Sequence, residues 1–355
     1  MKILVLSMAG IGDTLLATPF LHEMRLQYPD AEIDVLVFWA GSVDILQGNP
    51  HVNQVFQKNF LQASKFESMA FLNRIRGRGY DLSINTHPQS RVYYRMIARF
   101  IGAKKRLSHE YECDRWLNPW LMTKTIPQDY NLHTVAHNFQ FLELLGRKPV
   151  QTELELEVFL TEAETGWAEE FVSHRMLEGR PLIGFHVGSG GTKNLALKRW
   201  PLERYVELIR LVLERREDAA ILLFGGPQEQ ADHQIIRRLV PSARVFTVEG
   251  KGLRHAGALM RHLSAFISVD TSLMHLAAAV RPPNQIVIEA PTLNATNMPF
   301  RGDYSVVRNP AVNGKNLEYY RYDGREIQGT REHLIECMNS IGAEDVYAVL
   351  KERLG

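Results

Sequence analysis

The sequence has few cysteines, no long apolar run and almost no net charge. Its 355 residues hold only Cys113 and Cys337, which lie far apart and outside any metal-ligand spacing, so neither a disulfide framework nor a cysteine zinc site is indicated. No stretch approaches the roughly 18 apolar residues that a membrane-spanning helix needs. The apolar residues 3–7 run straight into a glycine turn without a cleavage site and predict a first strand. Together these features predict a cytoplasmic protein.

The charges are balanced overall but not locally. The chain has 41 Lys and Arg against 40 Asp and Glu, yet residues 74–106 contain nine basic residues and a single acid, Asp81. Such a segment favours an anionic partner. Nothing suggests a nucleic-acid-binding motif, so we expect no nucleic-acid partner. At 45% hydrophobic and 23% charged residues, the chain has the composition of an ordinary globular protein, and its length favours two domains.

The order of elements repeats in the two halves. Residues 3–7 form an apolar strand, followed by a glycine turn, a helix over 15–28 and a strand over 33–38, and the second half restarts with a strand at 182–187. This order is typical of doubly wound α/β domains. We therefore predict two Rossmann-like domains facing across a cleft, at 1–160 and 161–330, with a helical tail at 331–355. Residues 148–160 alternate like an exposed strand, and we place the connection there.

The first glycine turn carries a carboxylate instead of a phosphate-binding fingerprint. Leu15 stands where the third glycine of a dinucleotide motif belongs, and no Gly-Lys-Ser/Thr sequence supports a P-loop. Asp13, at the predicted helix start, would repel a pyrophosphate. It has two interpretations: a helix cap, or a group that accepts a proton from an incoming hydroxyl.

The second half offers groups suited to a nucleoside diphosphate. Ser189, Gly190 and Lys198 follow a strand, and Glu229 follows another at a position that commonly holds ribose hydroxyls. The strand at 265–269 leads into a helix through residues whose hydroxyls and amides suit phosphate: Asp270, Thr271, Ser272 and His275. The alternatives are a solvated loop, an ordinary helix cap and a surface histidine.

Two further features are interpreted as structural. Arg199, Trp200 and Pro201 anchor the following helix by packing. His133 and His137 have metal-ligand spacing, but no acidic general base lies between them, which favours surface or core histidines over a metal site.

Four motifs in this order make the sequence similar to glycosyltransferase family 9, the lipopolysaccharide heptosyltransferases, over nearly the whole chain. They are Gly10-Ile11-Gly12-Asp13-Thr14-Leu15-Leu16-Ala17-Thr18-Pro19, Phe185-His186-Val187-Gly188-Ser189 with Lys198-Arg199-Trp200-Pro201, Gly225-Gly226-Pro227-Gln228-Glu229, and Asp270-Thr271-Ser272-Leu273-Met274-His275. The sequence departs from the family at Ser272, where glycine is usual, in a longer turn at 188–197, and at residues 290–294.

The resemblance implies a GT-B fold and inverting transfer of a sugar, typically heptose from ADP-heptose, without a metal ion or other cofactor. Asp13 resembles the family's catalytic carboxylate. The positions that match donor contacts are Ser189, Gly190, Lys198, Glu229, Asp270, Thr271, Ser272 and His275. The nucleotide-sugar donor and an anionic glycolipid acceptor are the implied partners.

The acceptor side is predicted from the first domain. Gly12 and Thr14 flank Asp13, and Arg91, Arg95 and Arg99 recur every four residues on a predicted helix. These arginines suit an acceptor carrying phosphates and carboxylates, or peripheral contact with the inner membrane, while a merely solvated face is the alternative. Two rival functions also stay open, a nucleotide-sugar epimerase on the same fold and a non-catalytic nucleotide- or glycan-binding protein.

Overall fold

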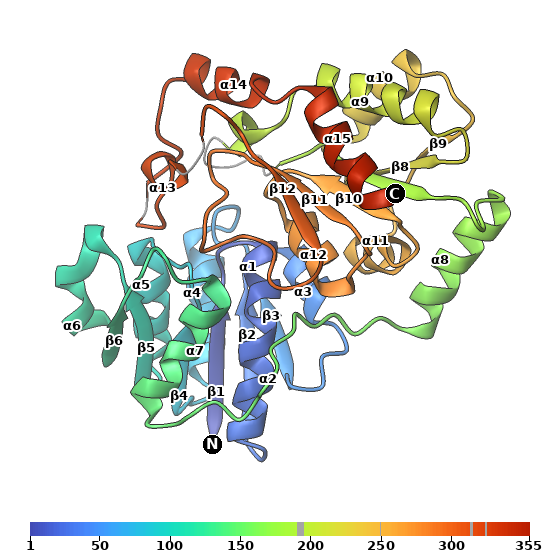
Figure 1. Ribbon diagram of the computed structural model, residues 1–355. Coiled ribbons are helices and arrows are strands. Elements are labelled where there is room, and N and C mark those ends of the chain that lie inside the picture. Colours follow the sequence, from blue (N-terminus) through green and yellow to red (C-terminus); the bar gives the residue numbers. More distant parts are fainter. Residues whose placement is uncertain (190–194, 249, 313–314, 324) are drawn as a thin grey trace. The chain divides into compact units, whose positions relative to one another are not determined.

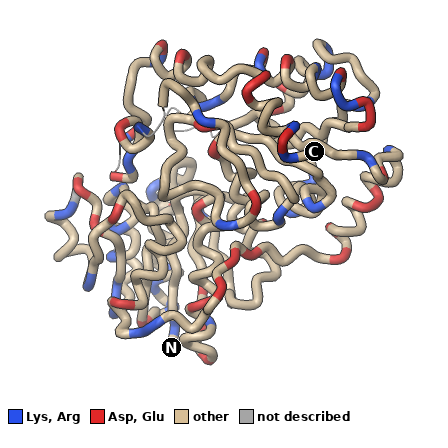
Figure 2. The backbone as a smooth tube through the Cα atoms, in the orientation of Figure 1, with Lys and Arg blue, Asp and Glu red and all other residues tan. Residues whose placement is uncertain are grey.

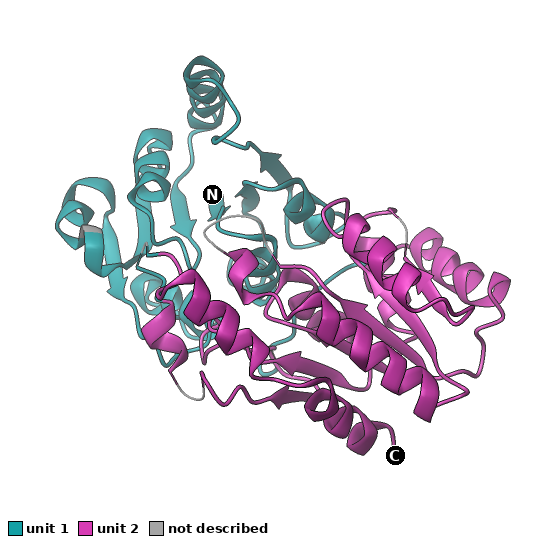
Figure 3. Ribbon diagram, turned by 90° about the horizontal axis from the view of Figure 1, so that it is seen from above, with its two compact units in different colours: residues 1–159, 321–325 teal, residues 160–320, 326–355 magenta. Residues whose placement is uncertain are grey.

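The computed structural model describes residues 1–189, 195–248, 250–312, 315–323 and 325–355, which form two compact units (Figure 3). Unit 1 comprises Met1–Phe159 and Arg321–Arg325, and unit 2 comprises Leu160–Tyr320 and Glu326–Gly355. The chain thus enters unit 2 at the end of the connecting segment 148–160. It returns briefly to unit 1 before its last helices.

Unit 1 is built on a six-stranded parallel sheet of order β3-β2-β1-β4-β5-β6 (Figure 1). Its strands are β1 (Lys2–Ser7), β2 (Glu32–Val37), β3 (Gln54–Gln57), β4 (Leu82–Asn85), β5 (Lys105–Glu110) and β6 (Lys124–Pro127). Its helices are α1 (Ile11–Leu16), α2 (Thr18–Gln27), α3 (Ala40–Leu46), α4 (Lys65–Arg76), α5 (Val92–Ile101), the 3-10 helix η1 (Glu112–Leu117), α6 (Asn118–Leu121) and α7 (Thr134–Leu145).

Unit 2 repeats this topology with the order β12-β11-β10-β7-β8-β9. Its strands are β7 (Leu182–His186), β8 (Ala220–Phe224), β9 (Val245–Thr247), β10 (Ala265–Ser268), β11 (Gln285–Ile288) and β12 (Tyr304–Val307). Its helices are α8 (Glu162–His174), the 3-10 helix η2 (Leu195–Lys198), α9 (Leu202–Arg215), α10 (Gln230–Leu239), α11 (Leu253–Met260), α12 (Ser272–Val280), α13 (Asn316–Tyr319), α14 (Arg331–Asn339) and α15 (Ala343–Leu354). The predicted α/β class with two doubly wound domains is confirmed.

Continuous apolar strands form because both faces of each sheet are covered. Ile3 and Val5 of β1 pack into a core with Phe20 and Phe141, from α2 and α7. The alternate residues of the same strand, Leu4 and Leu6, pack on the opposite face against residues of α4 and α5. A parallel strand buried on both sides needs apolar residues at every position, and β1 has them.

Two predicted elements differ in the structure. The helix expected over 15–28 is two helices, α1 and α2, separated at Ala17, because Pro19 occupies the first turn of α2 and cannot continue an α-helical hydrogen-bond ladder. The strand expected at 148–160 does not form. Its polar groups instead bond to α2, where the Glu157 amide donates to Thr18 Oγ1 at 2.9 Å and Gln151 Nε2 donates to the Pro19 carbonyl at 2.8 Å.

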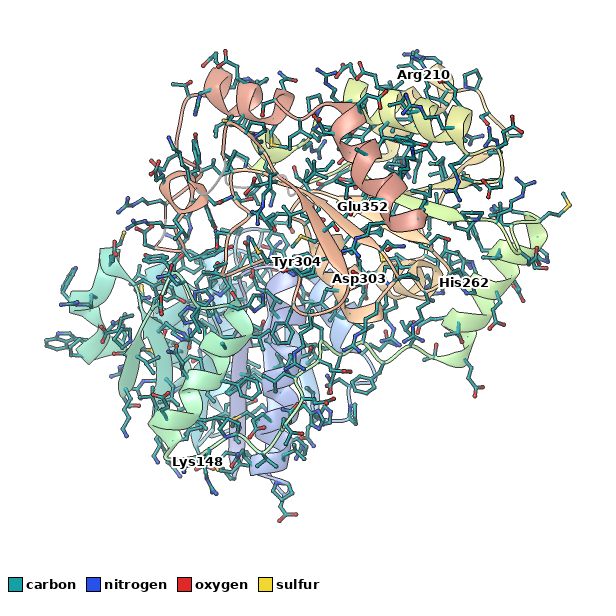
Figure 4. All side chains as sticks on the ribbon, viewed as in Figure 1. Lys148, Arg210, His262, Asp303, Tyr304 and Glu352 are labelled. Atoms are coloured by element: carbon teal, nitrogen blue, oxygen red, sulfur yellow. The ribbon has the colours of Figure 1, made fainter. Side chains whose placement is uncertain are left out.

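The last residues pack into unit 2. Val346 and Leu350 of α15 belong to the core on one face of the unit 2 sheet. Arg353 pairs with Asp303 at 2.6 Å and donates to the Tyr304 carbonyl at 3.2 Å, at the start of β12. Figure 4 labels Asp303 and Tyr304. The expected helical tail is therefore α14 and α15, held within unit 2. No helix among the described residues is long and apolar enough to cross a membrane.

Candidate active site

Asp13 lies at the carboxyl edge of the unit 1 sheet, in the first turn of α1 directly after β1. Its half-buried carboxylate turns back over Gly10, so that a Cβ at Gly10 would lie 2.8 Å from Asp13 Oδ2. The strand order reverses between β1 and β4, the place where open α/β sheets bind ligands. Gly10 thus gives Asp13 room at the ligand-binding edge of its unit.

The hydroxyl of Thr14 holds the turn that carries Asp13 in place. This residue is fully buried, and its hydroxyl lies 3.1 Å from the Gly10 carbonyl, 2.9 Å from Ser42 Oγ and 3.2 Å from Ser7 Oγ. The prediction that Thr14 contacts an acceptor is therefore corrected, because its side chain is occupied inside the unit. Gly12, on α1 beside it, is half-buried.

Two buried side chains contact each other in unit 1, and one of them is affected by the charge of Asp13. The guanidinium of Arg95 lies 5.5 Å from the centre of the Tyr111 ring, and the Tyr111 hydroxyl accepts a hydrogen bond from the Gln89 amide at 2.8 Å. Burial raises the pKa of Tyr111, the Gln89 amide and Arg95 lower it, and the charge of Asp13 raises it further. Asp13 therefore acts electrostatically on a buried phenol whose ring contacts the Arg95 guanidinium.

The three predicted acceptor arginines do not form one exposed row. Arg91 is the half-buried N-cap of α5, Arg95 is fully buried and Arg99 is exposed in the last turn. Arg95 faces inward because α5 buries the helix face that also carries Tyr94, Ala98 and other apolar residues. Only Arg91 and Arg99 have exposed surface to offer an anionic partner.

The basic segment 74–106 is also partly neutralised. Arg78 pairs with Glu32 and with Asp34 of β2, and Lys104 pairs with Asp81 at 2.7 Å. Arg106 donates to the carbonyls of Leu121 and Ala103. Figure 2 shows the Lys and Arg residues interspersed with Asp and Glu along the backbone. The run of positive charge in the sequence thus overstates the basic surface.

In unit 2, Asp270 is the centre of a buried polar network. It follows β10, and its Oδ2 lies 3.2 Å from Lys198 Nζ. The same oxygen accepts hydrogen bonds from Thr292 Oγ1 at 2.7 Å and from Asn297 Nδ2 at 3.0 Å. Burial raises the pKa of Asp270, but Lys198, His275 and Thr292 lower it more, so the carboxyl has a pKa below its usual value. The network therefore holds an ionised carboxylate beneath the first turn of α12.

Thr271 joins the ends of neighbouring strands. As N-cap of α12 it accepts a hydrogen bond from the Met274 amide at 3.3 Å, and its hydroxyl lies 3.2 Å from Nδ1 of His186, the last residue of β7. Burial, followed by the charges of His233, Arg199 and Lys198, lowers the pKa of His186 to about 3, so this ring is neutral. Ser272, half-buried, begins α12. The Met274 amide bonds to Thr271, while the amides of Ser272 and Leu273 are donors that a helix start leaves without a partner inside the helix.

Glu229 lies across the ends of β7 and β8. Its Oε2 accepts a hydrogen bond from the Gly226 amide at 2.8 Å. A Cβ at Gly188 would lie 2.3 Å from Glu229 Oε1, and one at Gly225 would lie 2.7 Å from Glu229 Cβ. The two glycines are therefore required for the carboxylate to occupy this place.

Arg199 connects these groups, a role that the sequence analysis missed. Its Nε donates to Ser189 Oγ at 3.2 Å, and its guanidinium lies 3.7 Å from Glu229 Oε1 and 3.3 Å from Asp232 Oδ2. The neighbouring Trp200 packs in the core as predicted, with Nε1 donating to the Ile341 carbonyl at 3.0 Å. Gly190 lies outside the described residues.

Thr292 and Asn297 were also missed. Both lie in the loop after β11, where residues 290–294 depart from the family pattern, and no motif signalled that their side chains reach Asp270. His137 is a core histidine, as the favoured interpretation predicted: its ring stacks on His87 with centres 4.3 Å apart, and its Nε2 lies 2.6 Å from the Asp129 carbonyl. His133 caps α7.

The two edges suit different chemistry. Unit 1 presents a carboxylate that can take a proton from a hydroxyl. Unit 2 gathers Lys198, Arg199 and the amide end of α12, which favour a diphosphate, beside Glu229, which can accept hydrogen bonds from a ribose.

Comparisons with known proteins identify the family of the chain. The family model described as glycosyltransferase family 9 (heptosyltransferase) matches residues 68–319. The lipopolysaccharide heptosyltransferase 3 of Escherichia coli K12 is 26% identical over 278 residues, covering 77% of this chain and 78% of the relative. The lipooligosaccharide heptosyltransferase 2 of Haemophilus ducreyi is 25% identical over 351 residues, 95% of each chain.

Solved structures share the fold. A glycosyl transferase family 9 structure from Veillonella parvula matches with a TM-score of 0.75 and 22% identity, covering 99% of this chain and 97% of the other. The E. coli heptosyltransferase WaaC with ADP-2-deoxy-2-fluoro heptose matches with a TM-score of 0.70 and 20% identity over 99% of each chain. Because the family model spans well over half of its length, the chain belongs to glycosyltransferase family 9, the heptosyltransferases, and is a glycosyltransferase.

Proposed function

We propose that this glycosyltransferase moves heptose from ADP-heptose, with inversion, onto a lipopolysaccharide core or a related glycan. The curated relatives are named lipopolysaccharide and lipooligosaccharide heptosyltransferases, and one structural neighbour holds an ADP-heptose analogue. The observation that carries the proposal is the buried Lys198–Asp270 pair, in which Asp270 directly precedes the N-cap of α12. A cation held there would stabilise the charge that a leaving diphosphate gains.

The donor is assigned to unit 2. Arg199 and the first-turn amides of α12 would bind the diphosphate, and Lys198 would stabilise the charge that develops on it. Asp270 sets the position of the Lys198 ammonium at 3.2 Å, while Thr292 and Asn297 hold Asp270. Glu229 would bind the ribose. The transfer needs no metal ion in this account, because side chains and amides of the chain supply the positive charge.

The acceptor is assigned to unit 1. Asp13 aligns the attacking hydroxyl and takes its proton as the new glycosidic bond forms and the bond to ADP breaks. Arg91 and Arg99 would contact phosphates or carboxylates of the glycan or an anionic membrane surface. We place the reaction in the cytoplasm, where a peripheral enzyme would meet the inner membrane.

Calorimetric titration with ADP, UDP and GDP, without and with Mg²⁺, tests the donor assignment. The proposal predicts that ADP binds at least ~10-fold more tightly than UDP or GDP, a difference of about 1.4 kcal/mol, and that Mg²⁺ leaves its affinity unchanged. Preference for UDP or GDP would contradict the assignment of ADP-heptose as the donor and leave the family assignment intact. Binding that requires Mg²⁺ would contradict the metal-independent mechanism.

A further inference from the structure

A cluster of two histidines and a glutamate lies in unit 1, away from the sheet edge that carries Asp13. His22 is on α2, His51 is in the loop before β3, and Glu157 is in the connecting segment. One ligand atom from each lies within 4.8 Å of the others, and all three side chains are partly buried. The three come from separate parts of the chain, so only the fold brings them together.

Both histidines face the carboxylate of Glu157. His22 Nδ1 lies 2.7 Å from Glu157 Oε1, and His51 Nε2 lies 3.4 Å from Glu157 Oε2. The two rings are stacked, with centres 4.0 Å apart and planes 8° apart. The nitrogen lone pair of an imidazole lies in the plane of its ring. With the two planes parallel, one ring must turn about its Cβ–Cγ bond before both histidines can direct a nitrogen at a shared ion.

One oxygen of the Glu157 carboxylate is left for a ligand. Glu157 Oε2 is buried and accepts no hydrogen bond from the described part of the chain, although His51 Nε2 lies 3.4 Å away. A buried carboxylate oxygen without a hydrogen bond favours a cation, while the positive charge of nearby Arg25 weakens that preference.

We propose that His22, His51 and Glu157 bind a borderline divalent ion of the Zn²⁺, Co²⁺ or Ni²⁺ class, with water completing the coordination. Imidazole and carboxylate ligands suit these ions, and a His₂Glu set with one open position is a known zinc arrangement. Ligands about 2.0–2.2 Å from zinc stand roughly 3.3 Å apart, so binding requires the three ligand atoms to approach one another and one imidazole ring to turn.

A metal ion at this site would anchor the connecting segment to α2 and to the loop before β3. Glu157 lies two residues before Phe159, whose ring meets the His51 ring edge-on with centres 6.0 Å apart. Phe159 is also the residue at which the chain leaves unit 1. A metal here is structural and takes no part in sugar transfer, so the inference does not depend on the proposed donor or mechanism.

Co²⁺ titration of the untagged, chelator-stripped full chain tests the site, with visible d–d absorption as the readout and Zn²⁺ as competitor. Wild type is expected to bind one ion per chain. His22→Gln and Glu157→Gln should bind at least ~100-fold more weakly, because even loss of an outer-shell partner of a metal site costs about 10–100-fold. His262→Gln is the matched control, since His262 is exposed and lies in unit 2 (labelled in Figure 4).

Thermal unfolding gives a second readout that needs no activity. Zn²⁺ should raise the melting temperature of wild type and His262→Gln and leave that of Glu157→Gln unchanged, because only a folded site binds the ion. Glu157→Gln keeps the size of the side chain. If the melt of metal-free Glu157→Gln shows no folded protein, His51→Gln is measured in its place. Failure of wild type to bind stoichiometric metal, or equal binding by wild type and the ligand variants, would overturn the proposal.

Discussion

At the scale of single residues, the candidate site in unit 2 depends on a buried ion pair. The side chains of Lys198 and Asp270 are 7% and 9% exposed, and Asp270 also receives two neutral hydrogen bonds. Burying two charges costs several kcal/mol each, and their attraction offsets this cost only while both are present. The pair therefore makes unit 2 sensitive to the loss of either partner. Under the proposed function it also positions a charge for the donor diphosphate.

Lys198→Met should lower the free energy of unfolding by about 3–5 kcal/mol, because it leaves the Asp270 carboxylate buried without its cation. Lys104→Met is the matched control: Lys104 pairs with Asp81 at 2.7 Å, but its side chain is 79% exposed, and such pairs are worth about 0–1 kcal/mol. Urea denaturation of both variants checks this. Equal stability of the two would show that the Lys198–Asp270 pair is not held in a low-dielectric environment.

At the scale of elements, each side chain of the candidate site is placed by a strand end and the turn after it. Glu229 reaches the end of β7 because Gly188 and Gly225 have no side chains. Thr271 fixes the start of α12, and Gly10 makes space for Asp13. The glycines of the motifs thus act through close approach of a carboxylate to the backbone.

Gly188→Ala should weaken ADP binding roughly 10-fold or more, about 1.4 kcal/mol, because the new Cβ would lie 2.3 Å from Glu229 Oε1 and displace that carboxylate. Gly226→Ala is the control, since a Cβ there would lie at an ordinary 3.8 Å from Glu229 Oε2. Calorimetry with ADP distinguishes them. Equal affinities would mean that Glu229 does not hold the nucleotide.

Helices α8 and α11 are joined by a buried ion pair that makes stability depend on pH. Glu164 lies 2.6 and 2.7 Å from two nitrogens of Arg254. Burial raises the pKa of Glu164, but the bonds from Arg254 and Thr161 outweigh it and lower the pKa to about 2. A lowered folded-state pKa adds stability above the unfolded pKa of about 4.3 and loses it as the pH falls toward 2.

Glu164→Gln should therefore flatten the fall in unfolding free energy between about pH 5 and pH 2, where the wild-type carboxylate takes up its proton. Glu162→Gln, at an exposed position in the same first turn, is the control. Denaturant unfolding at several pH values measures the slopes. A wild-type slope retained by Glu164→Gln would assign the acid sensitivity to other carboxylates.

At the scale of the whole molecule, the sequence predicted the repeated order of strands and helices and the local turns between them. The alternation of strand and helix predicted both doubly wound sheets, and the Asp270–Thr271 turn was correctly predicted as the junction of a strand and a helix. Contacts between distant segments were not predictable. Thr292 and Asn297 reach Asp270, and Glu157 reaches His22, only because the folded sheet and the connecting segment bring them together.

The charge pattern was misleading for a related reason. Arg95 is spaced like an exposed helix residue, yet the direction in which α5 faces was decided by its apolar side chains, which carry Arg95 inward. A single buried arginine beside Tyr111 is compatible with an amphipathic helix because the ring offers a favourable face to the guanidinium. Sequence periodicity gives the spacing of side chains but not which charged residue the core tolerates.

The most direct test of the central claim is the turnover of ADP-heptose with a lipopolysaccharide core acceptor by wild type, Asp13→Asn and the exposed control Asp30→Asn. Asparagine keeps the shape of Asp13 and removes its basicity, so kcat should fall by about 10²–10⁴-fold in Asp13→Asn while its affinity for ADP stays unchanged. Asp30→Asn should match wild type. Turnover by Asp13→Asn within a few-fold of wild type would contradict the account, because the proton would then leave by another route.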